Sequence, residues 1–551
     1  MPKRNKRSSF RGASAIIAGA TLTALLIAPV ASAANLSTTP FAVRATNIAE
    51  AKHFAIRPLF SGKADPTTPP TTTPPTTPPT TTPTAEPTTP VTTAPPEPVD
   101  PKPLTISMTL DTAPANCAAS DFSLELTSGR NVATSATIDW GDGSPVTPVT
   151  SSGMYKHSYA AGKSYNLNLG GEFYGITRSF SANANANNCI RSVDHFGTGT
   201  GLTSLQSMLS GATNLQSVAA PPKSVTNLQG FFEGASNFNG DISNWDVSNV
   251  TNFSNLFRSA TSFNGDLSKW NVSKGTSFSG MFQSAFKFNG NISSWNTGSA
   301  RYMTSMFKSA SVFNQDISNW NTAGVQNFTE MFNGARVFNQ PIGKWSTSSL
   351  LYAASMFRSA SVFDQDLSSW DVSRVADFSY MFQSASKFNG NIGTWKTGAG
   401  TVFSTMFASA ANFNQDLSGW DVSKGQDFAS MFSNTAKFNG DVTTWKPAAA
   451  TDMSYMFYNA TAFNRDISGW GSSLGKVTNF SNMFASATSF NQPIGGWNTG
   501  SATDMSSMFN TASSFNQNLR GWNVSKITTA AGKQYFSSNS PLTAANKPVG
   551  F

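Results

Sequence analysis

Apolar side chains recur with a period of 25 residues along most of the chain after residue 230. Ile242, Trp245 and Val247 are spaced by three and two residues in one unit, which predicts a short strand. The apolar positions from Val250 to Ala260 then recur at three and four, which predicts a short amphipathic helix. The period is carried by twelve tryptophans: Trp245, Trp270, Trp295, Trp320, Trp345, Trp370, Trp395, Trp420, Trp445, Trp470, Trp497 and Trp522.

Each unit can bury its apolar face only against its neighbours, so we expect a solenoid. The 25-residue units span 231–525, with a two-residue insertion between Trp470 and Trp497. Because the pattern is shorter and lacks tryptophan before this range, we expect an N-terminal cap and first atypical repeat at 191–230. The pattern decays after the range, and we expect a C-terminal cap at 526–551.

The repeats resemble those of the BspA-like leucine-rich-repeat surface proteins. The residues from Asn314 to Trp320 and from Met331 to Ala335 follow the family form F-N-x-D-I-S-x-W with a later M-F-x-x-A. The resemblance implies a leucine-rich-repeat solenoid with one short strand and one short helix in each turn. It also implies a secreted or surface-displayed binding protein, often adhesin-like, with diverse ligands and no assigned reaction.

Residues 104–190 show a different pattern, the alternation of apolar and polar residues that predicts β-strands. The run from Ile138 to Gly143 and the later Tyr155 to Tyr159 resemble a polycystic-kidney-disease-like (PKD-like) domain. This resemblance implies a small immunoglobulin-like β-sandwich. Asp139 and Asp142 are more typical of a turn than of a cation site. Cys117 and Cys189 would form one disulfide in an oxidising compartment.

The first 103 residues carry export and linker signals. A basic start, an apolar run from Ala13 to Val30 and small residues before Ala34 predict a signal peptide at 1–33. Residues 34–64 remain unassigned, and 30 of the 39 residues in 65–103 are Pro or Thr, which predicts an extended linker with sites for O-glycosylation. We therefore expect a secreted or cell-surface protein. An N-terminal tether to the envelope and free secretion both remain open.

Charge and apolar content exclude two classes of protein. The formal charge is +8, but five of the positive charges lie in the first eleven residues, and neither later segment is strongly basic. Nucleic acid is therefore not an expected partner. Outside the leader no apolar stretch approaches the roughly 18 residues that a membrane-spanning helix needs, so we expect no integral membrane domain after signal cleavage.

Three columns of repeated residues have competing interpretations. The tryptophans could stack on sugars, but their register with Ile242 and Val247 favours core packing. A column of asparagines beginning at Asn239 is expected to satisfy backbone groups at a tight corner. A column of aspartates beginning at Asp241 would repel unless hydrated, bridged by calcium, or turned toward backbone N–H groups. Its Pro and Asn members, such as Pro341, argue against an obligatory metal ladder, so we expect no cofactor.

Catalytic chemistry has little support in the sequence. The three histidines, His53, His157 and His195, lie outside the 25-residue repeats. The string from Gly471 to Gly475 matches G-x-S-x-G but coincides with the two-residue insertion, which marks a chance match. We expect a non-enzymatic binding protein that presents its repeats to an extracellular protein or glycan. The alternative is a secreted carbohydrate-active enzyme that draws its carboxylates from the aspartate column.

Overall fold

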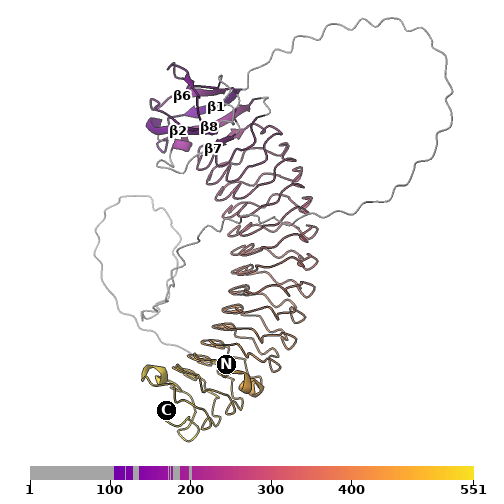
Figure 1. Cartoon of the computed structure of the whole chain (residues 1–551), viewed down its shortest axis with the longest axis vertical. Helices are drawn as coiled ribbons and strands as arrows, with labels where there is room; N and C mark the ends of the chain where they lie inside the picture. Colours follow the sequence, from indigo (N-terminus) through magenta and orange to yellow (C-terminus); the bar gives the residue numbers. More distant parts are fainter. Residues whose placement is uncertain are drawn as a thin grey trace, which may run out of the picture. The chain divides into compact units, whose positions relative to one another are not determined.

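The computed structural model describes residues 105–117, 119–127, 136–171, 173, 175–177, 186–197 and 201–551. The expected signal peptide (1–33), the unassigned segment (34–64) and the Pro/Thr-rich linker (65–103) lie outside the described residues. The chain divides into two units, residues 1–94 and 95–551, and all described residues belong to the second (Figure 1).

Short antiparallel strands form a β domain at the start of this unit. The larger sheet has the order β4-β3-β6-β1-β8-β9 and the smaller one β5-β2-β7. Buried residues of both sheets, such as Met108 and Phe122, join one apolar cluster. The strands are β1 (Thr105–Asp111), β2 (Phe122–Thr127), β3 (Thr137–Asp139), β4 (Thr147–Pro148), β5 (Gly153–His157), β6 (Ser164–Gly170), β7 (Gly175–Thr177), β8 (Ile190–Phe196) and β9 (Ser217–Val218). The 3-10 helices η1 (Ala119–Asp121) and η2 (Ala186–Cys189) connect them.

Both sheets continue into the first repeat turns. Strand β9 pairs in parallel with β8, and Gly175 of β7 forms a parallel bridge with Ser204. Because β8 also pairs with β1, it lies across the boundary expected at residue 190. The β domain therefore covers the N-terminal end of the repeats with paired strands.

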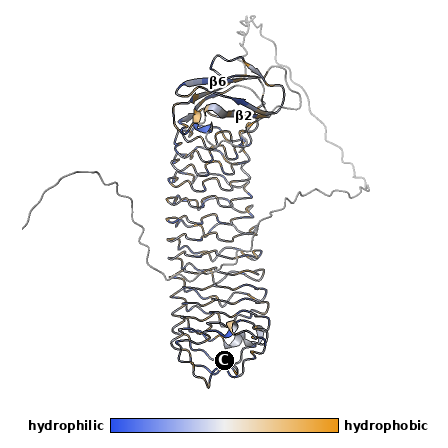
Figure 2. Ribbon diagram, turned by 90° about the vertical axis from the view of Figure 1, so that its left-hand side faces the viewer, coloured by the Kyte–Doolittle hydropathy of each residue, from blue (hydrophilic) through white to orange (hydrophobic). Residues whose placement is uncertain are grey.

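The repeats form stacked turns, which Figures 1 and 2 show one after another. Single parallel bridges join equivalent residues of successive turns, as in Asn252↔Ser277 and Ser277↔Tyr302. After residue 201 the only helices are the 3-10 helices η3 (Ser468–Ser473) and η4 (Ala531–Lys533). The prediction of a short helix in each repeat is wrong.

The backbone of the segment expected to be helical explains this difference. Alternate N–H groups donate to the next turn, as from Phe253 to the Ser277 carbonyl (2.9 Å). The N–H groups between them donate three residues back, as from Leu256 to the Phe253 carbonyl (3.2 Å). Asn255 (φ 57°) and Ser259 (φ 56°) are left-handed. Two left-handed residues in each turn prevent an α-helix, because they interrupt its right-handed backbone.

The segment expected to be a strand is also built differently. From Ile242 to Val250 the backbone makes tight turns, with the Trp245 N–H donating to the Ile242 carbonyl (3.2 Å) and the Val250 N–H to the Val247 carbonyl (2.9 Å). The parallel bridges fall later, at Asn252 and its equivalents. The spacing of three and two therefore reflects turns rather than a strand.

The C-terminal segment takes the place of one more turn. Met505 and Ser507 donate their N–H groups to the carbonyls of Gly532 and Gln534 (2.9 Å each). Phe536 packs on the ring of Phe509 of the preceding turn, with 5.4 Å between ring centroids. The last aromatic layer is thereby covered.

Candidate functional site

The tryptophan column lies in the core of the stacked turns. The twelve side chains are between 0% and 5% exposed. Each indole N–H from Trp270 onward donates to a carbonyl one turn earlier, as from Trp270 to Ile242 (3.0 Å). Neighbouring indoles stack, with 6.2 Å between the centroids of Trp245 and Trp270. Their faces are covered and offer no platform to a sugar.

The asparagine column is a ladder of side-chain to backbone bonds. The Oδ1 of Asn239 accepts the N–H of Asn264, and this contact repeats in each turn to Thr543 at 2.7–3.2 Å. Asp364 keeps the ladder intact because its carboxylate accepts the same bond from Asn389.

The aspartate column caps backbone groups within each turn. Each of its seven carboxylates accepts the N–H two residues later at 2.8–2.9 Å. These bonds hold the pKa below its ordinary value at Asp241, Asp266, Asp316, Asp441 and Asp466. The sequence left three ways to relieve repulsion between stacked aspartates: hydration, a calcium bridge, or orientation toward backbone N–H groups. In the structure the carboxylates are oriented toward backbone N–H groups. The described part of the chain holds no group of three metal-ligating side chains.

The turn from Ile138 to Gly143 in the β domain is held by local contacts. The carboxylate of Asp139 accepts the Gly141 N–H (3.0 Å), and Asp142 pairs with His157 at 2.7 Å. Trp140 stacks on the His157 ring with 4.6 Å between centroids. Hydrogen bonds from Ser144, and then from His157, lower the pKa of Asp142. Both aspartates therefore have turn contacts.

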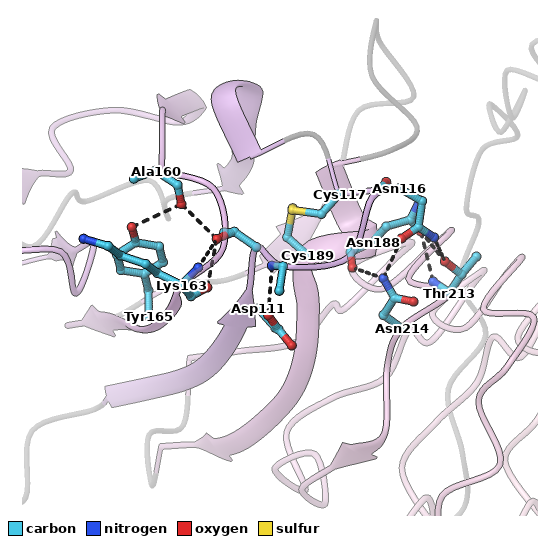
Figure 3. The surroundings of a disulfide bond; sticks show 12 residues. Asp111, Asn116, Cys117, Ala160, Lys163, Tyr165, Asn188, Cys189, Thr213 and Asn214 are labelled. Atoms are coloured by element: carbon cyan, nitrogen blue, oxygen red, sulfur yellow. Dashed lines mark hydrogen bonds between the residues drawn. A yellow bond between two sulfur atoms is a disulfide. The ribbon is translucent and has the colours of Figure 1, made fainter.

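The structure joins Cys117 and Cys189 in a disulfide with 4.8 Å between their Cα atoms. Figure 3 shows that Asn116 and Asn188, the neighbours of the two cysteines, reach Thr213. Asn116 donates to its hydroxyl (3.0 Å), and Asn188 accepts from that hydroxyl (2.6 Å). The disulfide therefore joins η2 to the segment after β1, and both hold the β domain to the first turns.

Two further candidates for catalytic chemistry, His195 and the string from Gly471 to Gly475, lie in different parts of the fold. His195 has its Nδ1 3.1 Å from the Thr105 carbonyl in the β domain. The string from Gly471 to Gly475 lies partly in η3, where Gly471 approaches the backbone of the next turn closely enough that a Cβ would meet the Gly496 carbonyl. This placement differs from the strand-to-helix elbow of serine hydrolases. His53 lies outside the described residues.

A surface absent from the sequence predictions is formed by the bridged segments of the turns. Each turn contains one nine-residue bridged segment, such as 251–259, and the last of these segments is 503–511. We define the ladder face as those side chains of the segments that are not buried. Tyr302 and Tyr352 lie on it, 49% and 56% exposed, and both belong to the column of bridged residues. Arg358 lies over the ring of Tyr380, 5.4 Å from its centroid.

Within the 25-residue repeats, exposed large apolar side chains are confined to a few neighbouring turns. Between residues 201 and 530, all large hydrophobic side chains that are exposed lie from Phe286 to Tyr380. We call this set the exposed band: Phe286, Tyr302, Val312, Val337, Tyr352, Val362 and Tyr380. Sequence reasoning missed it because its members are up to 94 positions apart and occupy several columns of the repeat, with Tyr302 and Tyr352 in one and Val312, Val337 and Val362 in another.

Comparison with known proteins identifies the repeats. The family described as "Mycoplasma protein of unknown function, DUF285" matches residues 203–318, 291–395, 356–470 and 442–545, which together cover more than half of the chain. The chain belongs to the DUF285 family. No curated protein and no solved structure matches it. The DUF285 repeats thus include the bridged turns and the exposed band. Among the described residues, no helix has the length and apolar character needed to cross a membrane.

Proposed function

We propose that this DUF285 protein is an exported, non-enzymatic binding protein, secreted or displayed at the cell surface. Its turns would form a leucine-rich-type solenoid, preceded by an immunoglobulin-like, PKD-like β domain. The ligand would be an extracellular protein or glycan. The leader pattern at 1–33 and the Pro/Thr-rich 65–103 support export.

The exposed band is the observation that carries this proposal. Almost every large apolar side chain of the turns is buried, so the restriction of the exposed ones to neighbouring turns needs an explanation other than packing. Tyr and Arg are enriched in the centres of protein interfaces, and Tyr also stacks on sugars. The pairing of Arg358 with Tyr380 adds a cationic group to the band.

The columns of the repeat supply substitutions that should leave the fold intact. Ser277 occupies the column of Tyr302 and Tyr352, and Ser355 occupies the column of Tyr380. The triple variant Tyr302→Ser, Tyr352→Ser and Tyr380→Ser therefore removes the rings while keeping residues that the turns already accept. Tyr535→Ser is the matched control, because Tyr535 is 60% exposed but lies in the C-terminal cap.

The test is an array of extracellular-matrix proteins and glycans, probed with the parent and both variants beside a reducing-sugar release assay. We expect the parent and Tyr535→Ser to bind the same ligand, and the triple variant to bind it at least about tenfold more weakly. Equal binding by the triple variant would place recognition elsewhere. Sugar release by the parent would support the enzyme alternative.

A further inference from the structure

Charge divides the ladder face into two halves. Up to residue 359 its segments carry Arg258, Arg301, Lys308 and Arg358 with two glutamates. Two of these cations are paired, Arg258 with Glu233 (3.2 Å) and Lys308 with Glu330 (2.6 Å). Within the described residues, Arg301 and Arg358 have no carboxylate at ion-pair distance. From 376 to 511 the segments carry no Lys or Arg and four aspartates: Asp377, Asp427, Asp452 and Asp504.

The turns do not need these four negative charges. Each of the four carboxylates accepts the N–H two residues later at 2.8–2.9 Å. Asparagine makes the same bond at equivalent positions in other turns, at 2.8–3.0 Å: Asn227, Asn252, Asn327 and Asn479. Aspartate and asparagine are therefore equivalent as caps, and the charge is additional to the structural role.

The extra charge also has a cost. Asp427 and Asp452 occupy adjacent bridged positions, and Asp377 lies two turns from Asp427. Burial raises the pKa of Asp427, and the charges of Asp452 and Asp377 raise it further. Like charges at this spacing repel in the isolated chain. A cationic partner would offset that repulsion.

We propose that the ladder face binds a second copy of this chain in antiparallel orientation. The inference rests on the proposed function, since it names a partner for the surface that carries Tyr302, Tyr352 and Tyr380. Arg301 lies in the turn of Tyr302, two turns before Tyr352, and Asp427 lies two turns after Asp377. A two-fold axis between the turns of Tyr352 and Asp377 therefore brings Arg301 opposite Asp427. Parallel copies would instead place like charges together.

The available area is adequate for a stable dimer. Thirteen bridged positions from Ser204 to Asp504, spaced by about 4.8 Å, give a strip about 58 Å long. A standard interface buries roughly 800 Å² on each partner, so contact over a width of about 14 Å is sufficient. Tyr302, Tyr352 and Tyr380 supply aromatic groups within this strip.

The test is sedimentation velocity over a concentration series at low and high salt. The aspartate variant is Asp377→Asn, Asp427→Asn, Asp452→Asn and Asp504→Asn. The arginine variant is Arg301→Gln and Arg358→Gln, which removes the two cations that have no ion pair among the described residues and uses residues found in the same columns at Gln326 and Gln383. We expect the parent to dimerise, each variant alone to have a Kd at least about tenfold higher, and salt to weaken the parent dimer.

Mixing the two variants gives the sharpest outcome. A mixed dimer keeps one of the two equivalent charged contacts, so its Kd should rise by only about the square root of the factor seen for each variant alone. Lys387→Gln with Lys437→Gln removes two exposed lysines outside the ladder face and should leave the parent Kd unchanged. Retained secondary structure and melting temperature show that each variant is folded.

Several results would overturn the inference. A parent chain that stays monomeric while its tyrosines bind an array ligand would leave the proposed function standing with a different partner. A dimer unaffected by either charge variant would use another face. A mixed dimer no tighter than the variants alone would exclude the antiparallel arrangement. A monomer that also binds no array ligand would remove both proposals.

Discussion

The β domain and the repeat turns build their cores by different rules. In the β domain, β1 alternates buried and half-buried residues, and partner strands satisfy its backbone. In the turns, backbone N–H groups donate three residues back, to a neighbouring turn or to Asn and Asp side chains, and aromatic columns fill the interior. The first region depends on contacts within and between two sheets. In the second region, each turn depends on the turns before and after it. A residue type that recurs at the same position in every turn is therefore required by the fold, and a residue that departs from the column is not.

The largest expected effect is the loss of one tryptophan from the middle of the stack. Trp370→Ala removes a 3% exposed side chain, its bond to Ile342 and its contact with Trp345, which should cost roughly 3–5 kcal/mol. Trp140→Ala should destabilise the β domain while leaving protection in the middle turns unchanged. Hydrogen exchange across both regions measures this difference. Unchanged unfolding of Trp370→Ala would contradict the nearest-neighbour core.

Loss of the disulfide should act on the opposite region. Cys117→Ser with Cys189→Ser opens a link between residues 72 apart and should destabilise the β domain by about 2–4 kcal/mol. Exchange should rise in β1, β8 and the first turns, where Asn116 and Asn188 contact Thr213. Turns beyond residue 300 serve as the internal control. Equal loss of protection there would show that the two regions unfold as one.

Left-handed positions provide a smaller, stabilising change. Thr405 has φ 61°, which is unfavourable for a β-branched residue, and Gly280 occupies the same column. Thr405→Gly should therefore raise the free energy of unfolding by about 1 kcal/mol. Thr401→Gly is the matched control, because it removes a hydroxyl bond to the Ala376 carbonyl and should destabilise. Chemical denaturation compares the two, and a destabilised Thr405→Gly would refute the strain argument.

The smallest expected effect comes from two aspartates whose pKa values are shifted in opposite directions. The pKa of Asp427 is raised in the folded chain, so its ionisation opposes folding, and Asp427→Asn should raise Tm at pH 7. The pKa of Asp441 is lowered by bonds from Thr443, so Asp441→Asn should lower Tm at pH 7. The Asp427 difference should shrink while the pH is still falling toward 3.8, the ordinary pKa, because the folded carboxyl is protonated first. The Asp441 difference should persist down to pH 3.8 and shrink below it, because there the unfolded carboxyl is protonated first. Shifts of the same sign for both variants would contradict this assignment.

The sequence predicted part of this structure. The 25-residue spacing of tryptophan, in register with Ile242, predicted an inward column, and these side chains are buried. Apolar spacing of three and four also suits consecutive turns, so it could not show that Asn255 and Ser259 are left-handed. The ladder face could not be predicted either, because Tyr302 and Tyr352 come together only through the bridge to the residue between them, Asn327.

The central claim is that recognition uses the exposed band and not the structural columns that begin at Asn239 and Asp241. Hydroxyl-radical footprinting tests it directly, comparing the free chain with the chain bound to its array ligand or concentrated into dimers. The account predicts lower oxidation of Tyr302, Tyr352 and Tyr380, with Tyr535 unchanged. Unchanged oxidation of the three tyrosines, with protection at other exposed residues, would contradict it.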